Sequence, residues 1–321
     1  MSDGVEDWLW RLVERGKTPG IQYAWADRNG AEGSYWAGWA DLRERRPMTA
    51  ATPLMAYSMS KVLTAHAVWR LAGVALDEPL QRFVPGTPYG GEVTLRQLLK
   101  HRSGIPNPIP LRWVHPAAAH AGFDEGAALE EQMRRHPRLA FAPGTRRLYS
   151  NLGYWLLGRV VERVTGRRFT DFVEEEVLRP WRIGPDEIGY AGETRGYLER
   201  FSLLNLVRPW ITDPWIAGAR EGRWVEIAPH YVNGAAFGGA IGTAAGFCRL
   251  GLRLLESGDP GWGWEERDGV LQKEGGGAGF HFLLRLDRRR GRVSVVMANA
   301  AGLDVQGCLD RPSPSAMAGE P

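Results

Sequence analysis

The chain has 321 residues, of which 44% are apolar, and a net charge of +3. This length and apolar content indicate a large folded unit with a substantial core rather than a disordered chain. The small net charge, with arginines spread along the whole chain, excludes a basic block of the kind that binds nucleic acid.

The first residues predict a helix and a hairpin. Apolar residues recur at helical spacing over residues 4–15, and the pattern ends near Gly16. Two short runs rich in Tyr, Trp and Ile, residues 21–26 and 34–40, are joined by a stretch that contains Asn29-Gly30. Such a turn between two strand-like runs is typical of a β-hairpin. A second helix is predicted over residues 58–72.

From about residue 76 to 234 the pattern is mainly helical, with apolar helices predicted over 154–164 and 169–178. Strands return at 278–286 and 292–299, on either side of a turn. These patterns predict an α+β fold (an α/β sandwich), with an antiparallel sheet built from the N- and C-terminal segments and flanked by helices.

The expected division of the chain is a sheet domain formed by residues 1–75 plus 235–311, and a mainly helical inserted subdomain at 76–234. The tail at 312–321, rich in Pro and Ser, is expected to be disordered.

Lysine is scarce in this chain, which has four lysines and 36 arginines. Arginine keeps its proton at any working pH, whereas a desolvated lysine can release one and act as a base. A lysine that lies beside a serine in such a chain therefore indicates a candidate catalytic base. Lys61 lies three residues after Ser58, and residues three apart share one face of a helix.

About 0.14 Ser-x-x-Lys matches are expected by chance from eleven serines and four lysines, and one occurs. Taken alone, the pair is equally consistent with an ordinary helix start, in which Ser58 is a cap and Lys61 is a solvated charge. As a catalytic pair, Ser58 would be a nucleophile and the neutral amine of Lys61 a proton acceptor.

Two further motifs follow in order. Tyr149-Ser150-Asn151 lies on a loop just before a predicted helix. A tyrosine between two ammonium groups would have its phenolate favoured and could move the serine proton, and the amide of Asn151 could orient a substrate carbonyl. Lys273 then opens the run Lys273-Glu274-Gly275-Gly276-Gly277 on a predicted edge strand, where glycines admit a substrate close to the backbone.

With Ser-x-x-Lys, Tyr-x-Asn and Lys-x-Gly in this order, the sequence resembles the serine β-lactamase and penicillin-binding-protein superfamily. Within it, the chain is similar to the class C-like branch, which also holds DD-peptidases, D-amino-acid peptidases and family VIII-type carboxylesterases. The resemblance covers about residues 5 to 300.

The resemblance implies a role for each motif. Ser58 would be the acylated nucleophile, and Lys61 and Tyr149 would be the base and the proton shuttle, in an order that the sequence leaves open. Asn151, Lys273 and Gly275 would bind substrate, and Gly276 would supply the second N–H of an oxyanion hole.

The sequence departs from the family's pattern in two places. Glu274 occupies a position where penicillin-recognising members usually have a threonine, and it would repel a substrate carboxylate unless it points away along the strand. After Asn299 only residues 303–309 can form a helix, where the family normally has a long one. Both departures favour an uncharged acyl substrate. The second also predicts a sheet face that is less covered, which another copy of the chain could close to form a homo-oligomer.

Other candidate sites are weaker. His101 could serve a Ser-His-Asp triad, but no Gly-x-Ser-x-Gly elbow occurs. His281 follows the glycine run and is more simply a satisfied or exposed histidine. Four aromatic residues could line an acyl pocket but more simply pack a loop, namely Trp210, Trp215, Trp224 and Tyr231. Neither metal-ligand spacing nor a nucleotide-binding fingerprint occurs, so no metal and no cofactor are predicted.

The sequence thus predicts a serine hydrolase that forms an acyl-enzyme on Ser58, foremost a carboxylesterase acting on short-chain or aryl esters. The alternatives are a β-lactamase or D-amino-acid peptidase, and a non-catalytic binding protein of the same fold. The expected partner is a small ester or amide. Since no signal-peptide pattern or apolar span occurs, no membrane association is expected and the cytoplasm is the expected compartment.

Overall fold

The computed structural model describes residues 4–71, 73–108 and 112–309. The predicted disordered tail at 312–321 lies outside these residues. Among the described residues no helix has both the length and the apolar character needed to cross a membrane.

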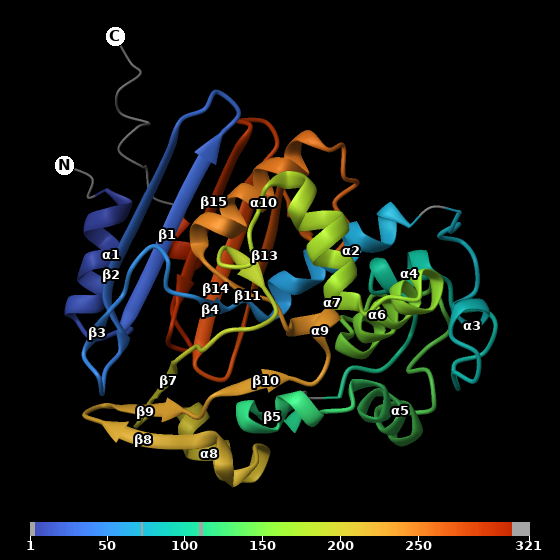
Figure 1. Cartoon of the computed structure of the whole chain (residues 1–321), viewed down its shortest axis with the longest axis horizontal. Helices are drawn as coiled ribbons and strands as arrows, with labels where there is room; N and C mark the ends of the chain where they lie inside the picture. Colours follow the sequence, from blue (N-terminus) through green and yellow to red (C-terminus); the bar gives the residue numbers. More distant parts are fainter. Residues whose placement is uncertain (1–3, 72, 109–111, 310–321) are drawn as a thin grey trace.

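A seven-stranded sheet forms one half of the molecule, in the order β12-β13-β14-β15-β1-β2-β3 (Figure 1). All neighbouring strands run antiparallel. The strands are β1 (Gly20–Asp27), β2 (Glu32–Asp41), β3 (Arg46–Pro47), β12 (Glu265–Arg267), β13 (Val270–Gly277), β14 (Phe280–Asp287) and β15 (Arg292–Ala298). The two predicted hairpins are present as β1–β2 and β14–β15, and β1 joins them by pairing with β15. The prediction of an antiparallel sheet built from both ends of the chain is confirmed.

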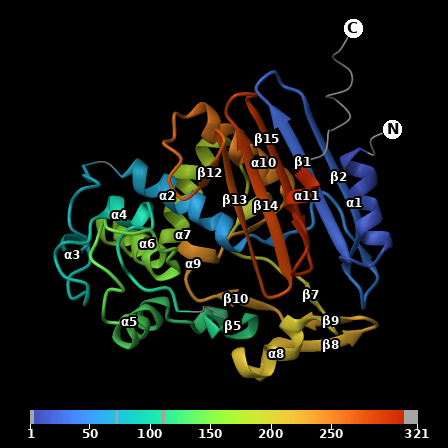
Figure 2. The ribbon, with the colours of Figure 1, turned by 180° about the vertical axis from the view of Figure 1, so that it is seen from behind.

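Helices cover both faces of this sheet. On one face lie α1 (Val5–Glu14) and the short α11 (Gln306–Leu309), which Figure 2 shows from behind. On the other face lies α10 (Ala244–Glu256), against β1, β14 and β15. The first of these faces was expected to be poorly covered. That expectation is wrong, because α1 together with Leu303 and Val305 buries its apolar strand residues within a single chain.

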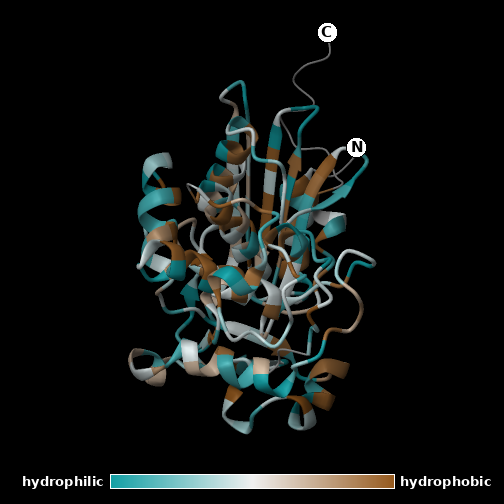
Figure 3. Cartoon of the chain, turned by 90° about the vertical axis from the view of Figure 1, so that its right-hand side faces the viewer, coloured by the Kyte–Doolittle hydropathy of each residue, from teal (hydrophilic) through white to brown (hydrophobic). Residues whose placement is uncertain are grey.

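The other half is mainly helical. Its helices are α2 (Ser60–Arg70), α3 (Leu80–Phe83), α4 (Leu95–Leu99), α5 (Glu125–Arg135), α6 (Asn151–Thr165), α7 (Phe169–Phe172) and α9 (Ala235–Gly238). A π-helical turn, Val173–Leu178, continues α7, so the predicted helix 169–178 changes its winding midway. Figure 3, which views the molecule from the side of this half, shows hydrophobic residues on helices near the middle of the molecule. Every residue from Ser60 to Val68 is buried, because α2 runs through the centre of this core.

Short strands form three smaller sheets. They are β10 (His230–Val232) with β5 (Val114–Pro116); β11 (Ile241–Gly242) between β4 (Leu54–Met55) and β6 (Ile188–Gly189); and β7 (Gly196–Glu199), β9 (Trp224–Ile227) and β8 (Ala217–Glu221) in that order. The last sheet and α8 (Leu203–Ile211) lie below the large sheet in Figure 1. The sequence pattern predicted no strands in this part of the chain.

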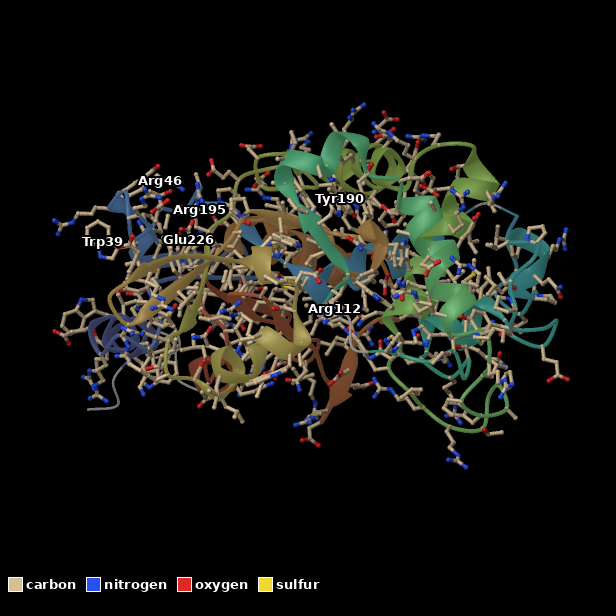
Figure 4. All side chains as sticks on the ribbon, turned by 90° about the horizontal axis from the view of Figure 1, so that it is seen from below. Trp39, Arg46, Arg112, Tyr190, Arg195 and Glu226 are labelled. Atoms are coloured by element: carbon tan, nitrogen blue, oxygen red, sulfur yellow. The ribbon has the colours of Figure 1, made fainter. Side chains whose placement is uncertain are left out.

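An ion cluster ties the β7–β9–β8 sheet to the large one. The guanidinium of Arg195 lies 2.7 Å from Glu226 of β9 and 3.5 Å from Asp41 of β2, and Figure 4 shows Arg195 beside Glu226. Both carboxylates are largely buried, so the pairs are screened less by solvent than ordinary surface ion pairs. The cluster thus fixes the small sheet at the end of the large one.

Candidate active site

Ser58 lies in the 3₁₀ turn Tyr57–Met59, immediately before α2 begins at Ser60. The helix therefore starts two residues later than the sequence pattern predicted. Tyr57 has φ +36°, which L-residues rarely adopt. Its hydroxyl hydrogen-bonds Nε2 of His230 at 2.9 Å, and its ring packs under Gly277. These contacts hold Ser58 at the N-terminal end of α2. No sequence pattern indicated Tyr57 or His230 as part of the site.

Lys61 is fully buried on the first turn of α2. Its Nζ lies 2.6 Å from the carbonyl oxygen of Phe237 and 3.3 Å from Ser58 Oγ. Burial, followed by the nearby charge of Lys273, holds the pKa of Lys61 well below its usual value. A neutral amine can donate one N–H to the Phe237 carbonyl and keep its lone pair for the Ser58 proton. The structure thus places the predicted pair in contact, and burial favours the neutral form of the lysine.

Tyr149 is the second group on the serine. Its hydroxyl lies 2.7 Å from Ser58 Oγ, and its ring lies between Lys61 Nζ at 4.9 Å and Lys273 Nζ at 5.0 Å from the ring centroid. The arrangement between two amines is as expected, but the electrostatic consequence is not. Burial raises the pKa of Tyr149 above its usual value and outweighs the hydrogen bond from Ser58, which lowers it. The phenol therefore keeps its proton.

His101 holds the segment that carries Tyr149. This residue has φ +55° and is buried, and its carbonyl oxygen accepts the N–H of Leu148 at 2.8 Å. Its Nδ1 accepts the N–H of Ser150 at 3.1 Å, and its ring packs on the ring of Tyr149 at 4.5 Å. Burial and then the nearby lysines hold the pKa of His101 well below its usual value, so the ring stays neutral. His101 contacts Tyr149 rather than Ser58, so it forms no Ser-His-Asp triad.

Asn151 was predicted to lie on a loop, but it is the buried first residue of α6, which begins three residues earlier than predicted; Tyr149 and Ser150 do precede the helix. Its backbone N–H donates to Oδ1 of Asn107 at 2.9 Å, and the preceding Ser150 caps the helix by accepting from the N–H of Gly153. These bonds fix the loop before α6. Within the described parts of the chain, no hydrogen bond joins the Asn151 side chain to Ser58 or Lys61.

Lys273 and Glu274 lie on opposite faces of β13. Lys273 is buried beside Tyr149, and burial lowers its pKa to about 8. Glu274 is partly exposed on the other face, where it accepts from Nε2 of Gln306 at 2.6 Å and lies 3.3 Å from His281. The alternation of side chains along a strand thus separates Glu274 from the amines.

The glycines of β13 are needed for close approach. A β-carbon on Gly275 would lie 3.1 Å from Ser58 Cβ and 2.9 Å from the ring of Phe282. One on Gly276 would lie 2.5 Å from the carbonyl oxygen of Phe280. Only glycine therefore lets this strand pass beside the serine, which is where a backbone N–H would meet a substrate carbonyl.

The weaker candidates do not assemble into a site. Trp210 is exposed on α8, Trp224 is buried against Tyr197, and Tyr231 stacks on His120. Trp215 packs against Leu198, Ile216 and Ile227, so the four aromatics do not share one set of neighbours. No group of three or more potential metal ligands occurs within the described residues.

A family model and several known proteins are similar to this chain. The family described as Beta-lactamase matches residues 5–313. Penicillin-binding protein 4* of Bacillus subtilis (strain 168) is 28% identical over 168 residues, which are 51% of this chain and 35% of that protein. The aligned part therefore spans about a third of that relative's length.

Two solved structures share the fold over almost the whole chain. D-amino acid amidase from Ochrobactrum anthropi SV3, complexed with D-phenylalanine, has a TM-score of 0.78 at 21% identity and 95% coverage of both chains. EstCE1, a hydrolase with promiscuous acyltransferase activity, has a TM-score of 0.70 at 18% identity and 94% coverage of both chains. The match over residues 5–313 shows that this chain belongs to the Beta-lactamase family.

Proposed function

We propose that the chain is a serine hydrolase that works through a covalent acyl-enzyme on Ser58. The observation that carries this proposal is the contact of Ser58 Oγ with two groups able to move its proton, Tyr149 at 2.7 Å and Lys61 at 3.3 Å. A serine hydroxyl is a weak nucleophile until a nearby base takes its proton.

The low pKa of Lys61 and the raised pKa of Tyr149 support Lys61 as the base. In the acylation step the Ser58 proton passes to Lys61 while Oγ bonds to the substrate carbonyl carbon. The N–H groups of Ser58 and Gly276 would hold the resulting oxyanion. When the intermediate collapses, the bond to the leaving group breaks, and the proton returns from Lys61 through the Tyr149 hydroxyl to the departing oxygen. Water then repeats the sequence and frees the acid.

We further propose an uncharged ester as the substrate, which makes the enzyme a carboxylesterase. Glu274 faces away from the amines, so it does not repel a substrate carboxylate, but this position also supplies no side-chain hydroxyl that could bind one. The C-terminal helix, α11, has a single turn. Among the described residues, α11 (Gln306–Leu309) carries no basic side chain that could bind a substrate carboxylate.

An amidase is the second candidate. It is favoured by the likeness over 95% of the chain to a D-amino acid amidase. Both candidates use the same nucleophile and base, and they differ in whether the leaving group is an alcohol or an amine.

The test compares wild type with Ser58→Ala on p-nitrophenyl acetate, D-phenylalanine amide and nitrocefin. Ser34→Ala, on the exposed side of β2, is the matched control. We expect turnover of the acetate by wild type and Ser34→Ala and its loss in Ser58→Ala, together with labelling of Ser58 by a fluorophosphonate. Equal turnover in Ser58→Ala would remove the nucleophile assignment. Faster turnover of the amide or of nitrocefin would replace the carboxylesterase proposal, and absence of labelling would indicate a non-catalytic binding protein.

A further inference from the structure

A cavity of about 270 Å³ lies beneath α8, at the end of the glycine run. Its walls are largely apolar and come from α8, β7, β9 and the turn between β13 and β14. The apolar side chains that line it are Leu198, Leu204, Ile211, Ile216, Ile227 and Phe280. Cavities that hold whole small ligands measure roughly 300–1,000 Å³. This cavity is therefore suited to one portion of a substrate.

The cavity adjoins the proposed centre through β13. Gly275 lies against Ser58, and the next two residues, Gly276 and Gly277, are part of the cavity wall. Because these two residues have no side chains, β13 itself places none between the serine and the cavity, and the ring of Tyr57, which packs under Gly277, lies beside this path.

The position of the proton-moving groups decides which part of a substrate would enter the cavity. Tyr149 packs against Lys273, three residues before Gly276 on β13. The leaving group must receive its proton from Tyr149 or Lys61, so it departs toward the Lys273 end of the strand. The acyl group lies on the opposite side of the reacting carbon and therefore points along the glycines toward the cavity.

The charges around the cavity restrict the acyl group further. Among the described residues, the ionisable side chains that line it are Arg208 of α8 and His281 of β14, and none of these lining residues carries a carboxylate. An ammonium group at the end of an acyl chain would find no partner there, whereas burial of hydrocarbon against aliphatic walls is favourable.

We propose that this cavity is the acyl-chain subsite of the Ser58 centre, and that the substrates are esters of uncharged apolar acids longer than acetate. This inference rests on the proposed acyl-enzyme. Leu204 and Ile211 of α8 are then specificity-determining residues, because they form the wall that the end of the chain contacts.

The test is a series of p-nitrophenyl esters from acetate to octanoate. Burial of each methylene increases kcat/KM about fourfold until the cavity is full. Leu204→Trp reduces the cavity and removes this gain, so the ratio of octanoate to acetate turnover falls. Leu204→Ala enlarges the cavity and shifts the best substrate to a longer chain.

Leu206→Trp is the matched control, since Leu206 is two-thirds exposed on the same helix and is not among the cavity-lining residues. Its chain-length profile stays that of wild type. Two results would refute the subsite and leave the hydrolase proposal standing. One is that wild type turns over the acetate but turnover does not rise with chain length. The other is that Leu206→Trp changes the chain-length profile as much as Leu204→Trp does. If no ester is turned over at all, the proposed function itself has failed.

Discussion

Replacement of Lys61 by arginine removes the ability of this position to accept a proton. Arginine keeps several donors for the Phe237 carbonyl, but its guanidinium is a permanent cation that does not release a proton in proteins. We therefore expect Lys61→Arg to lose acylation of Ser58 and to place a fixed charge where burial disfavours one.

The size of the loss follows from what Lys61 contacts. A positioned general base contributes about 10²–10⁴-fold to a rate, so acylation should fall by that factor. The variant should also unfold more easily. Lys61 is fully buried among a carbonyl group and the rings of Tyr149, Tyr154 and Phe237, and a permanent charge there would contact no carboxylate of the described residues. Lys61→Met removes the base without burying a charge, so it should lose activity with a smaller loss of stability.

The assay is the pre-steady-state release of p-nitrophenol, with thermal unfolding measured on the same samples. Lys17→Arg and Lys100→Arg are matched controls, because both lysines are exposed and should tolerate arginine with little change in rate. A Lys61→Arg protein that acylates at close to the wild-type rate would refute the assignment of Lys61 as the base. Loss of activity in the two control variants would show that the assay reports general damage.

Three further predictions concern groups around the centre. Because the pKa of Lys273 is lowered to about 8, its ammonium loses its proton within the pH range of the assay. We therefore expect kcat/KM to fall as pH rises through about 8. This fall should be absent from the pH profile of Lys273→Arg. His101→Asn keeps an acceptor for the N–H of Ser150 and tolerates positive φ, so its kcat should stay near that of wild type. His101→Phe keeps an aromatic ring but loses the acceptor, so it should lower kcat about tenfold at unchanged KM. Burial raises the pKa of Glu125 from 4.5 to about 7, so ionisation of this carboxyl opposes folding. The stability that the protonated carboxyl contributes below pH 4.5 is lost as pH rises through about 7. Glu125→Gln should remove that slope, worth up to about 3 kcal/mol, from urea unfolding measured at pH 5 and pH 8.

The sequence predicts the parts of this fold that depend on local signals. The Asn29-Gly30 turn and the alternating runs on either side of it are sufficient to predict the β1–β2 hairpin. The contact between Ser58 and Lys61 likewise follows from helical spacing, although the helix itself starts two residues later.

Other parts have no local signal. The Lys61 amine is held by the backbone carbonyl of Phe237, which every residue type offers, so no sequence pattern could indicate it. The balance that keeps Tyr149 protonated depends on burial, whereas the sequence shows only the two lysine charges. The strands β7, β8 and β9 have four or five residues each, and contacts distant in sequence, such as that between Arg195 and Asp41, hold them in place.

The pairing of β1 with β15, in which Ile21 lies opposite Ala298, has a consequence for how the chain reaches its fold. Contacts between residues so far apart in sequence give the domain a high contact order, and folding rates fall as contact order rises. During synthesis the β1–β2 hairpin leaves the ribosome long before its partner strand, with the outer edge of β1 unpaired. We expect refolding to be slow, and chains truncated before residue 292 to aggregate through this edge.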